Sequence, residues 1–299
     1  MPAYKNVAVA GASGDLGSHV FKKLVESGKF NIRVLKRAGS ESKFPEGTEV
    51  VEVDYESLDS LTTALKGQEV VVSTLTTLAA ATQSVLIDAA VAAGVQRFLP
   101  SEFGSNLDIP SVRKLPLFGA KVAIQDKLIE LSKASKISYT FVYNSVFLDW
   151  GLHHNFFLDF EKSTATLIDG GEAEFTTTSL DSVGDGVVGV LSHPEETKNR
   201  VVYIQDAVLT QKKVLELAKK ANPSKTWTVN TAVLDELTAK SDERLSKGLL
   251  DWETFTPYLY RAIYDPASVP KFPKLDNELL GVKGKTEDEI LELIKPLAK

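Results

Sequence analysis

The sequence of 299 residues has no cysteine and no apolar run long enough to cross a membrane. Without cysteine the chain forms no disulfide, no thiolate nucleophile and no cysteine-based metal site, which fits a reducing compartment. A membrane-spanning helix needs about 20 consecutive apolar residues, so we expect no contact with a membrane. The apolar residues 7–10 run straight into a glycine-rich segment, so they predict a strand rather than a signal peptide. We therefore expect a cytoplasmic protein.

Three familiar catalytic patterns are also missing. None of the eight tyrosines is followed four positions later by the lysine of ordinary short-chain dehydrogenases. Residues 11–15 lack the final glycine of a serine-hydrolase elbow. The four histidines have no metal-ligand spacing, so no metal is expected. The net charge of −6 argues against non-specific binding of nucleic acid through the whole surface.

A glycine pattern is the most informative feature that the sequence does contain. It follows the apolar run 7–10, and an amphipathic helix and a second strand come after it, as in a βαβ unit. Such a loop lets the backbone approach a diphosphate and aims N–H groups and the helix dipole at it. The alternative is an ordinary glycine-rich turn. The residues of the predicted loop are Gly11, Ser13, Gly14, Asp15, Leu16 and Gly17.

Strand-like and helix-like segments alternate through the first half of the chain. This alternation predicts right-handed βαβ crossovers and an α/β fold, a Rossmann-type doubly wound parallel sheet. The second half is less regular and predicts a smaller α/β substrate-binding lobe, so we divide the chain into 1–150 and 151–299, with part of the second half returning to the sheet edge. Expected strands are 7–10, 32–36, 49–53, 70–75, 97–100, 139–143, 175–179 and 200–205. Expected helices are 15–27, 57–65, 80–93, 115–135, a helix capped by Asp181 and running to 193, 210–221, 234–247 and 286–297.

The end of the second expected strand indicates which nucleotide is bound. A site selective for NAD usually has an acidic residue about 20 positions after the glycines, but Arg37 stands there. With Arg33, Lys36 and Lys43 it forms a basic cluster on an acidic protein. A guanidinium binds phosphate with two parallel hydrogen bonds, so the 2′-phosphate of NADPH is the natural ligand. The alternative is a solvated strand end. Asp54 follows the third strand and is a candidate for the adenine, or simply begins a turn.

Lys121 is the best candidate for acid–base chemistry. If residues 117–135 form one helix, Lys121 lies near the middle of its broad apolar face. In a partly dry cleft, desolvation disfavours the ammonium and makes the amine a proton acceptor near neutral pH. The alternative is a lysine whose amine reaches out to solvent.

Several segments resemble the isoflavone reductase-like branch of the NmrA-like atypical short-chain dehydrogenases. The resemblance is carried by the glycine loop, Arg37, the segment 97–104 (Arg-Phe-Leu-Pro-Ser-Glu-Phe-Gly) and the position of Lys121 after it. It covers about the first 155 residues well and the rest only in outline. It implies NADPH along the glycine loop, with Arg37 and Lys43 on the 2′-phosphate, Phe103 near the nicotinamide and Lys121 as catalytic base or acid. Thr74, at the end of the fourth strand, is a further cofactor-binding candidate, and Glu102 is expected to tie down its loop.

The resulting hypothesis is an NADPH-dependent reductase of a small aromatic or polyketide-like substrate. The alternatives are a non-catalytic sensor of NADP status and a redox-neutral isomerase or cyclase on the same fold. We expect a monomer or homodimer. The alternative for each candidate of the pocket wall is that it belongs to the core. These candidates are Phe147, Trp150, His153, His154, Phe156, Phe157, Trp252, Phe255 and Tyr258.

Overall fold

Seven parallel strands form the central sheet of the computed structural model, which describes residues 4–76, 79, 82–268, 272 and 274–299. The strand order is β10 (Arg200–Tyr203), β6 (Ser138–Tyr143), β5 (Arg97–Leu99), β4 (Val70–Ser73), β1 (Asn6–Ala10), β2 (Asn31–Arg37) and β3 (Glu49–Val53). Every pairing in this sheet is parallel. The predicted Rossmann-type α/β fold is therefore confirmed, and the strand order reverses between β1 and β4.

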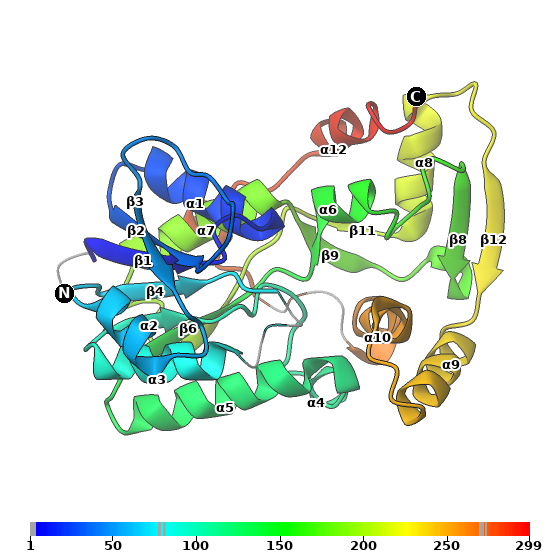
Figure 1. Cartoon of the computed structure of the whole chain (residues 1–299). Helices are drawn as coiled ribbons and strands as arrows, with labels where there is room; N and C mark the ends of the chain where they lie inside the picture. The colour runs from blue at the N-terminus through cyan, green and yellow to red at the C-terminus, as the bar shows by residue number, and fades with distance from the viewer. Residues whose placement is uncertain (1–3, 77–78, 80–81, 269–271, 273) are drawn as a thin grey trace.

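Helices cover both faces of this sheet (Figure 1). On one face lie α1 (Asp15–Glu26) and α7 (Leu180–Ser192), and on the other α2 (Leu58–Leu65), α3 (Gln83–Ala92) and α5 (Gly119–Lys133). Side chains of a strand point alternately to the two faces. In β1, Val7 and Val9 join the core under α1 and α7, whereas Ala8 and Ala10 join the core under the other three helices. Burial on both sides explains why the strands read as nearly continuous apolar runs.

Two predicted helix starts differ from the structure, and a third falls on residues that the structure does not describe. The expected helix 115–135 begins with a separate 3₁₀ turn, Pro116–Phe118, and α5 itself starts at Gly119. The N-cap of α7 is Ser179, whose hydroxyl accepts from the Ser182 N–H, while Asp181 lies in the first turn. The expected helix 80–93 starts at residues 80–81, which lie outside the described residues, and α3 is described from Gln83.

The smaller lobe has its own apolar core and two small sheets. One sheet joins β7 (Val146–Phe147), β9 (Phe175–Thr178) and β11 (Ala207–Leu209), and the other pairs β8 (Thr164–Ile168) with β12 (Thr228–Ala232). Its helices are α6 (Leu148–His153), α8 (Gln211–Ala221), α9 (Leu234–Ser246), α10 (Trp252–Tyr264) and α12 (Glu287–Ile294). The short helices α4 (Pro110–Arg113) and α11 (Asn277–Leu280) complete the fold. Across the described ranges, no helix combines the length and apolarity needed to cross a bilayer.

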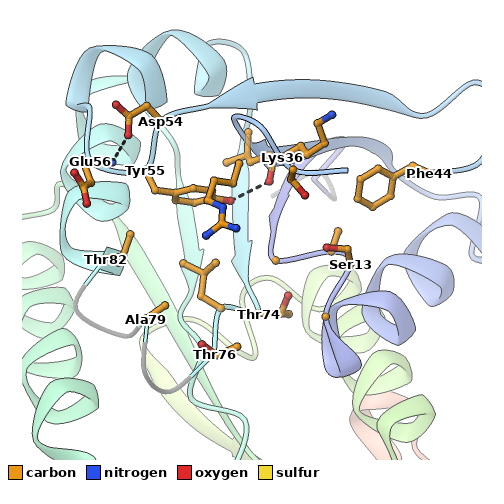
Figure 2. Close-up of a pocket in the computed structure, with 17 residues that line it drawn as sticks. Ser13, Lys36, Phe44, Asp54, Tyr55, Glu56, Thr74, Thr76, Ala79 and Thr82 are labelled. Carbon is orange, nitrogen blue, oxygen red and sulfur yellow. Dashed lines mark hydrogen bonds between the residues drawn. The ribbon is translucent and has the colours of Figure 1, made fainter. Parts of the chain in front are cut away.

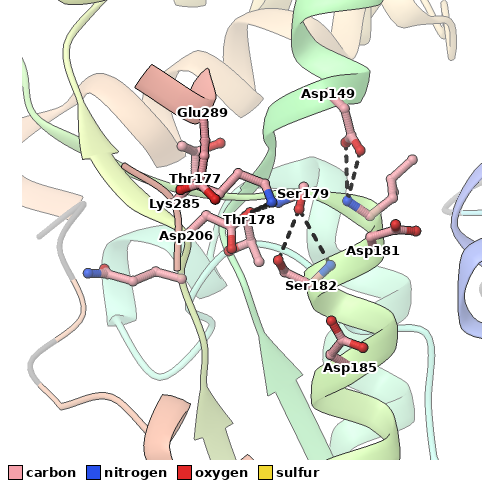
Figure 3. Close-up of polar contacts among 12 residues, drawn as sticks. Asp149, Thr177, Thr178, Ser179, Asp181, Ser182, Asp185, Asp206, Lys285 and Glu289 are labelled. Atoms are coloured by element: carbon pink, nitrogen blue, oxygen red, sulfur yellow. Dashed lines mark hydrogen bonds and ion pairs between the residues drawn. The ribbon is translucent and has the colours of Figure 1, made fainter. Parts of the chain in front are cut away.

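The two lobes meet at the N-terminus of α7, which packs on α1 but is capped by the smaller lobe (Figure 3). Both carboxylate oxygens of Asp149, on α6, accept from the Leu180 N–H at 3.1 Å. Asp206, between β10 and β11, accepts from the Ser179 N–H at 2.8 Å. Helix N-termini carry unsatisfied N–H groups and attract negative charge, so the two carboxylates hold the lobes together at this point.

Candidate functional site

A cavity of about 490 Å³ opens at the carboxyl ends of β1, β2 and β4 (Figure 2). Ligands of open α/β sheets bind where the strand order reverses, here between β1 and β4. Of the predicted cofactor-binding residues, those that line this cavity are Gly11, Ser13, Gly14, Arg37, Asp54 and Thr74.

The glycine loop needs two of its glycines for different reasons. Gly11 has φ +83°, a conformation that side chains other than glycine rarely adopt. At Gly17 a Cβ atom would lie 1.9 Å from the Gly11 carbonyl oxygen, so only glycine lets α1 pack this closely on the loop. Gly14, the N-cap of α1, has no side chain that competes for the helix N–H groups. The start of α1 therefore offers donors and a positive dipole end to an anion.

The predicted basic cluster is smaller than expected. Arg33 forms an ion pair with Glu49 at 2.7 Å, and Lys36 with Glu52 at 2.7 Å, because β3 lies beside β2. Lys43 is exposed and lies outside the lining of the cavity, whereas Arg37 lines it. Arg37 is thus the cation best placed for a phosphate at this strand end.

Tyr55 is a cavity residue that sequence reasoning missed. Its hydroxyl donates to the Leu35 carbonyl at 2.9 Å, and the residue lines the cavity beside Asp54 (Figure 2). Asp54 also begins a turn, because its carboxylate accepts from the Glu56 N–H at 2.9 Å. Tyr55 directly follows Asp54 at the carboxyl end of β3. The position at a strand end that made Asp54 a candidate therefore makes Tyr55 one as well.

A second cavity, of about 260 Å³, continues from the first and shares Gly14, Thr74, Leu75 and Thr76 with it. Residues of both lobes line it. The predicted residues among them are Asp15 and Leu16 of α1, Phe103, Lys121, Phe147 and Trp150, together with Phe156 and Trp252. The two cavities form one trough that leads from Arg37, past the start of α1, to Lys121.

Lys121 is buried at the wall of this second cavity, with 8% of its surface exposed. Its Nζ donates to the main-chain oxygen of Glu102 at 2.5 Å. Burial lowers the pKa of Lys121, partly opposed by the Glu102 carboxyl. The residue also lies in the first turn of α5, where the positive end of the helix dipole disfavours a cation. Both burial and the helix dipole therefore shift Lys121 toward its neutral form relative to an exposed lysine.

Other predicted wall residues lie elsewhere. Phe157 is in the core of the smaller lobe, with its ring stacked 5.3 Å from that of Phe175. His153 and His154 are exposed on and after α6, and the ring of His154 stacks on that of Trp150 with their centroids 4.6 Å apart. None of these three residues lines the cavity, and the residue of α6 that does so is Trp150. Phe255 and Tyr258 belong to the main core.

Ser145 is another missed residue of the second cavity. It has φ +54°, which is uncommon for serine, and its N–H donates to the Gly104 carbonyl at 3.0 Å.

Within the ranges described, no group of three or more histidine, aspartate or glutamate residues could hold a metal ion.

Comparisons with known proteins agree with this Rossmann-type dinucleotide-binding architecture. The model of the NmrA-like family matches residues 3–240. Oxidoreductase poxI of Penicillium oxalicum is 31% identical over 300 residues, which cover 96% of this chain and 93% of that protein. Oxidoreductase aprR of Aspergillus flavus is 34% identical over 247 residues, 82% of each chain. The solved structure of AtPrR2 with NADP+ and (+)pinoresinol matches with a TM-score of 0.80 at 22% identity, over 98% of this chain and 100% of that one.

The chain belongs to the NmrA-like family, and the resemblance noted in the sequence is confirmed. The match to AtPrR2 spans both lobes, so the whole fold is shared with that protein.

Proposed function

We propose that this protein is an NADPH-dependent oxidoreductase that reduces a small aromatic or polyketide-like molecule, with Lys121 as the acid–base residue. The observation that carries the proposal is the buried amine of Lys121 in the same cavity as the start of α1 and Phe103. The names of the two fungal relatives and the NADP+ in the AtPrR2 structure support the reaction class and the cofactor.

The residues present fit NADPH. Gly11 and Gly17 carry no side chain that would keep a diphosphate from the backbone of the loop. The N-terminus of α1 would bind the diphosphate. Arg37 would hold the 2′-phosphate, and Phe103 would contact the nicotinamide. NADPH supplies a hydride when bound. Lys121 would take a proton from a phenol or enol of the substrate, or return one to an oxygen that gains charge.

The lining of the second cavity supports an aromatic substrate. Most of its side chains are apolar or aromatic, with rings contributed by Phe147, Trp150, Phe156 and Trp252. Such walls exclude water and bind a flat molecule by apolar contact, while few polar groups orient it. A sensor of NADP status has no need for a buried amine beside this cavity, so Lys121 favours the enzyme over the sensor.

Replacing Lys121 with Ala tests the proposal. We expect Lys121→Ala to abolish NADPH oxidation across a panel of phenols and quinones, with NADPH affinity changed by less than about threefold, because the amine lies beyond the phosphate-binding part of the trough. Lys127→Ala is the matched control, since Lys127 is on the same helix but pairs with Asp88 at 2.7 Å. Retained turnover in Lys121→Ala would overturn the assignment. Product formed without NADPH consumption would indicate the isomerase or cyclase instead.

A further inference from the structure

A buried carboxyl group, that of Glu102, lies behind Lys121 on the loop after β5. Glu102 is 2% exposed and does not line either cavity at the sheet edge. Its main-chain oxygen accepts the hydrogen bond from Lys121 Nζ at 2.5 Å. The same residue therefore fixes the amine through its backbone and carries a buried carboxyl group that interacts electrostatically with it.

A chain of hydrogen bonds from α5 and α4 holds this carboxyl group. Gln125 Nε2 donates to Glu102 Oε2 at 2.8 Å and to the Tyr143 hydroxyl oxygen at 2.9 Å. Gln125 Oε1 accepts from Arg113 Nη1 at 2.6 Å. Because a guanidinium has only donors, it fixes the orientation of the Gln125 amide, which must then donate toward Glu102. Arg113 is itself anchored to Asp126 at 2.5 Å.

The other carboxyl oxygen is not satisfied by the protein. Glu102 Oε1 is buried and has no hydrogen-bond partner among the residues described. Burial raises the pKa of Glu102 to about 7, while Lys121, Gln125 and Arg113 oppose this rise and Asp108 adds to it. The two buried groups thus favour each other's charged forms, and Glu102 changes its charge in the pH range where a buried lysine would work.

The charged and titratable groups around the pair come from several elements. Asp108 and Arg113 lie toward Glu102 from the segment after β5 and from α4, and Tyr143 lies toward it from β6. Asp15, at the start of α1, lines the same cavity as Lys121. Among the residues described, Glu102 is the charged group whose electrostatic interaction raises the pKa of Lys121, so a change in its side-chain charge should act on the amine most strongly.

We propose that Glu102 is a positioning residue for Lys121: its main-chain oxygen fixes the place of the amine, and its buried carboxyl group sets how readily the amine holds a proton. The role in turnover rests on the proposed function, but the effect on the amine does not. An ionised Glu102 stabilises the ammonium, and a neutral side chain at this position leaves the amine easier to deprotonate.

Glu102→Gln keeps the size of the side chain and removes its charge. We expect Lys121 to react about tenfold faster with dilute acetic anhydride near neutral pH, since loss of one unit of pKa gives tenfold more free amine. Reactivity is measured peptide by peptide by mass spectrometry from about pH 5 to about pH 9. Asp88→Asn is the matched control. It removes the carboxylate that pairs with Lys127, a lysine on the same helix as Lys121, and should leave the reactivity of Lys121 unchanged.

The wild-type protein gives a second test that does not depend on the folding of the variant. Its Lys121 reactivity should depart from a single-proton curve, with a break near the pKa of Glu102, about 7. A single-proton curve in the wild type, or a Glu102→Gln variant with unchanged Lys121 reactivity, would overturn the proposal. NADPH oxidation is assayed separately, so failure of the proposed reaction and failure of this coupling are distinguishable.

Discussion

At the scale of single residues, the tightest requirement of the nucleotide loop is at Gly17. A Cβ there would lie 1.9 Å from the Gly11 oxygen, 2.7 Å from the Gly11 carbonyl carbon and 2.7 Å from Thr74 Oγ1, and the two contacts with Gly11 are to the loop that would bind the diphosphate. We expect Gly17→Ala to push α1 away from the loop, to lower NADPH affinity at least about tenfold and to cost about 1–3 kcal/mol of stability. Fluorescence titration with NADPH and thermal unfolding measure the two effects.

Gly119 provides the control for this substitution. It is the first residue of α5, and a Cβ there would meet no atom within 4 Å. Gly119→Ala should therefore leave NADPH affinity unchanged and leave stability unchanged or slightly higher. Equal affinity in the Gly17 and Gly119 variants would show that the close packing of α1 on the loop is unimportant for binding.

The sequence alone predicts the surroundings of some residues but not of others. Helical periodicity placed Lys121 on the apolar face of one helix but left open whether its amine is buried or reaches solvent, and the structure shows it buried. The contact of Lys121 with Glu102 joins a helix to a loop after a strand, and no periodicity encodes such a contact. The same reason explains why the predicted basic cluster included Lys36: its partner Glu52 lies on a neighbouring strand.

At the scale of elements, α7 is the helix whose start depends most on another lobe. The Leu180 N–H donates to both oxygens of Asp149, and Leu180 and Trp150 lie on the wall of the second cavity. We expect Asp149→Ala to cost about 1 kcal/mol, the usual value of a lost N-terminal cap. The melting temperature should then fall by about 2–4 °C. Hydrogen exchange should also become faster at the Leu180 amide.

Asp185 is the control on the same helix. It pairs with Lys23 at 3.0 Å at a partly exposed site and lies outside the contacts of the Leu180 amide. Asp185→Ala should leave exchange at Leu180 unchanged. If Asp149→Ala also left it unchanged, the proposed role of the carboxylate in holding α6 on α7 would be wrong.

Elements of the first half were predictable to within one or two residues at most strand ends, because their apolar runs are buried on both faces. In the second half, β9, β10, α7, α8 and α9 were also predicted to within two residues, whereas β8, β11, β12 and α10 were not predicted. β12 pairs with β8 over a distance of about 64 positions, as in Thr228 with Thr164, and most of β12 is exposed. α10 contains Pro257, and its aromatic residues suggested a pocket wall rather than a helix. Short, exposed or proline-containing elements form through contacts that a local pattern does not encode.

At the scale of the whole molecule, the trough joins the lobes, since its two cavities share Gly14 and Thr74 and the second is lined by residues of both lobes. A nucleotide bound there stabilises the folded protein by RT ln(1 + [L]/Kd), which is about 2.7 kcal/mol at 100 times Kd. The ligand can therefore be identified from melting temperatures, without a substrate.

We expect Arg37 to determine which dinucleotide raises the melting temperature more. Its guanidinium lines the cavity, where the other cation, Lys36, is paired with Glu52, so NADPH should raise the melting temperature more than NADH at equal concentration. In Arg37→Ala this difference should disappear because NADPH loses affinity while NADH keeps it. Arg33→Ala, at a residue paired with Glu49, should keep the difference. If Arg37→Ala preserved it as well, the 2′-phosphate would be bound elsewhere, and the exposed Lys43 would be the next residue to test.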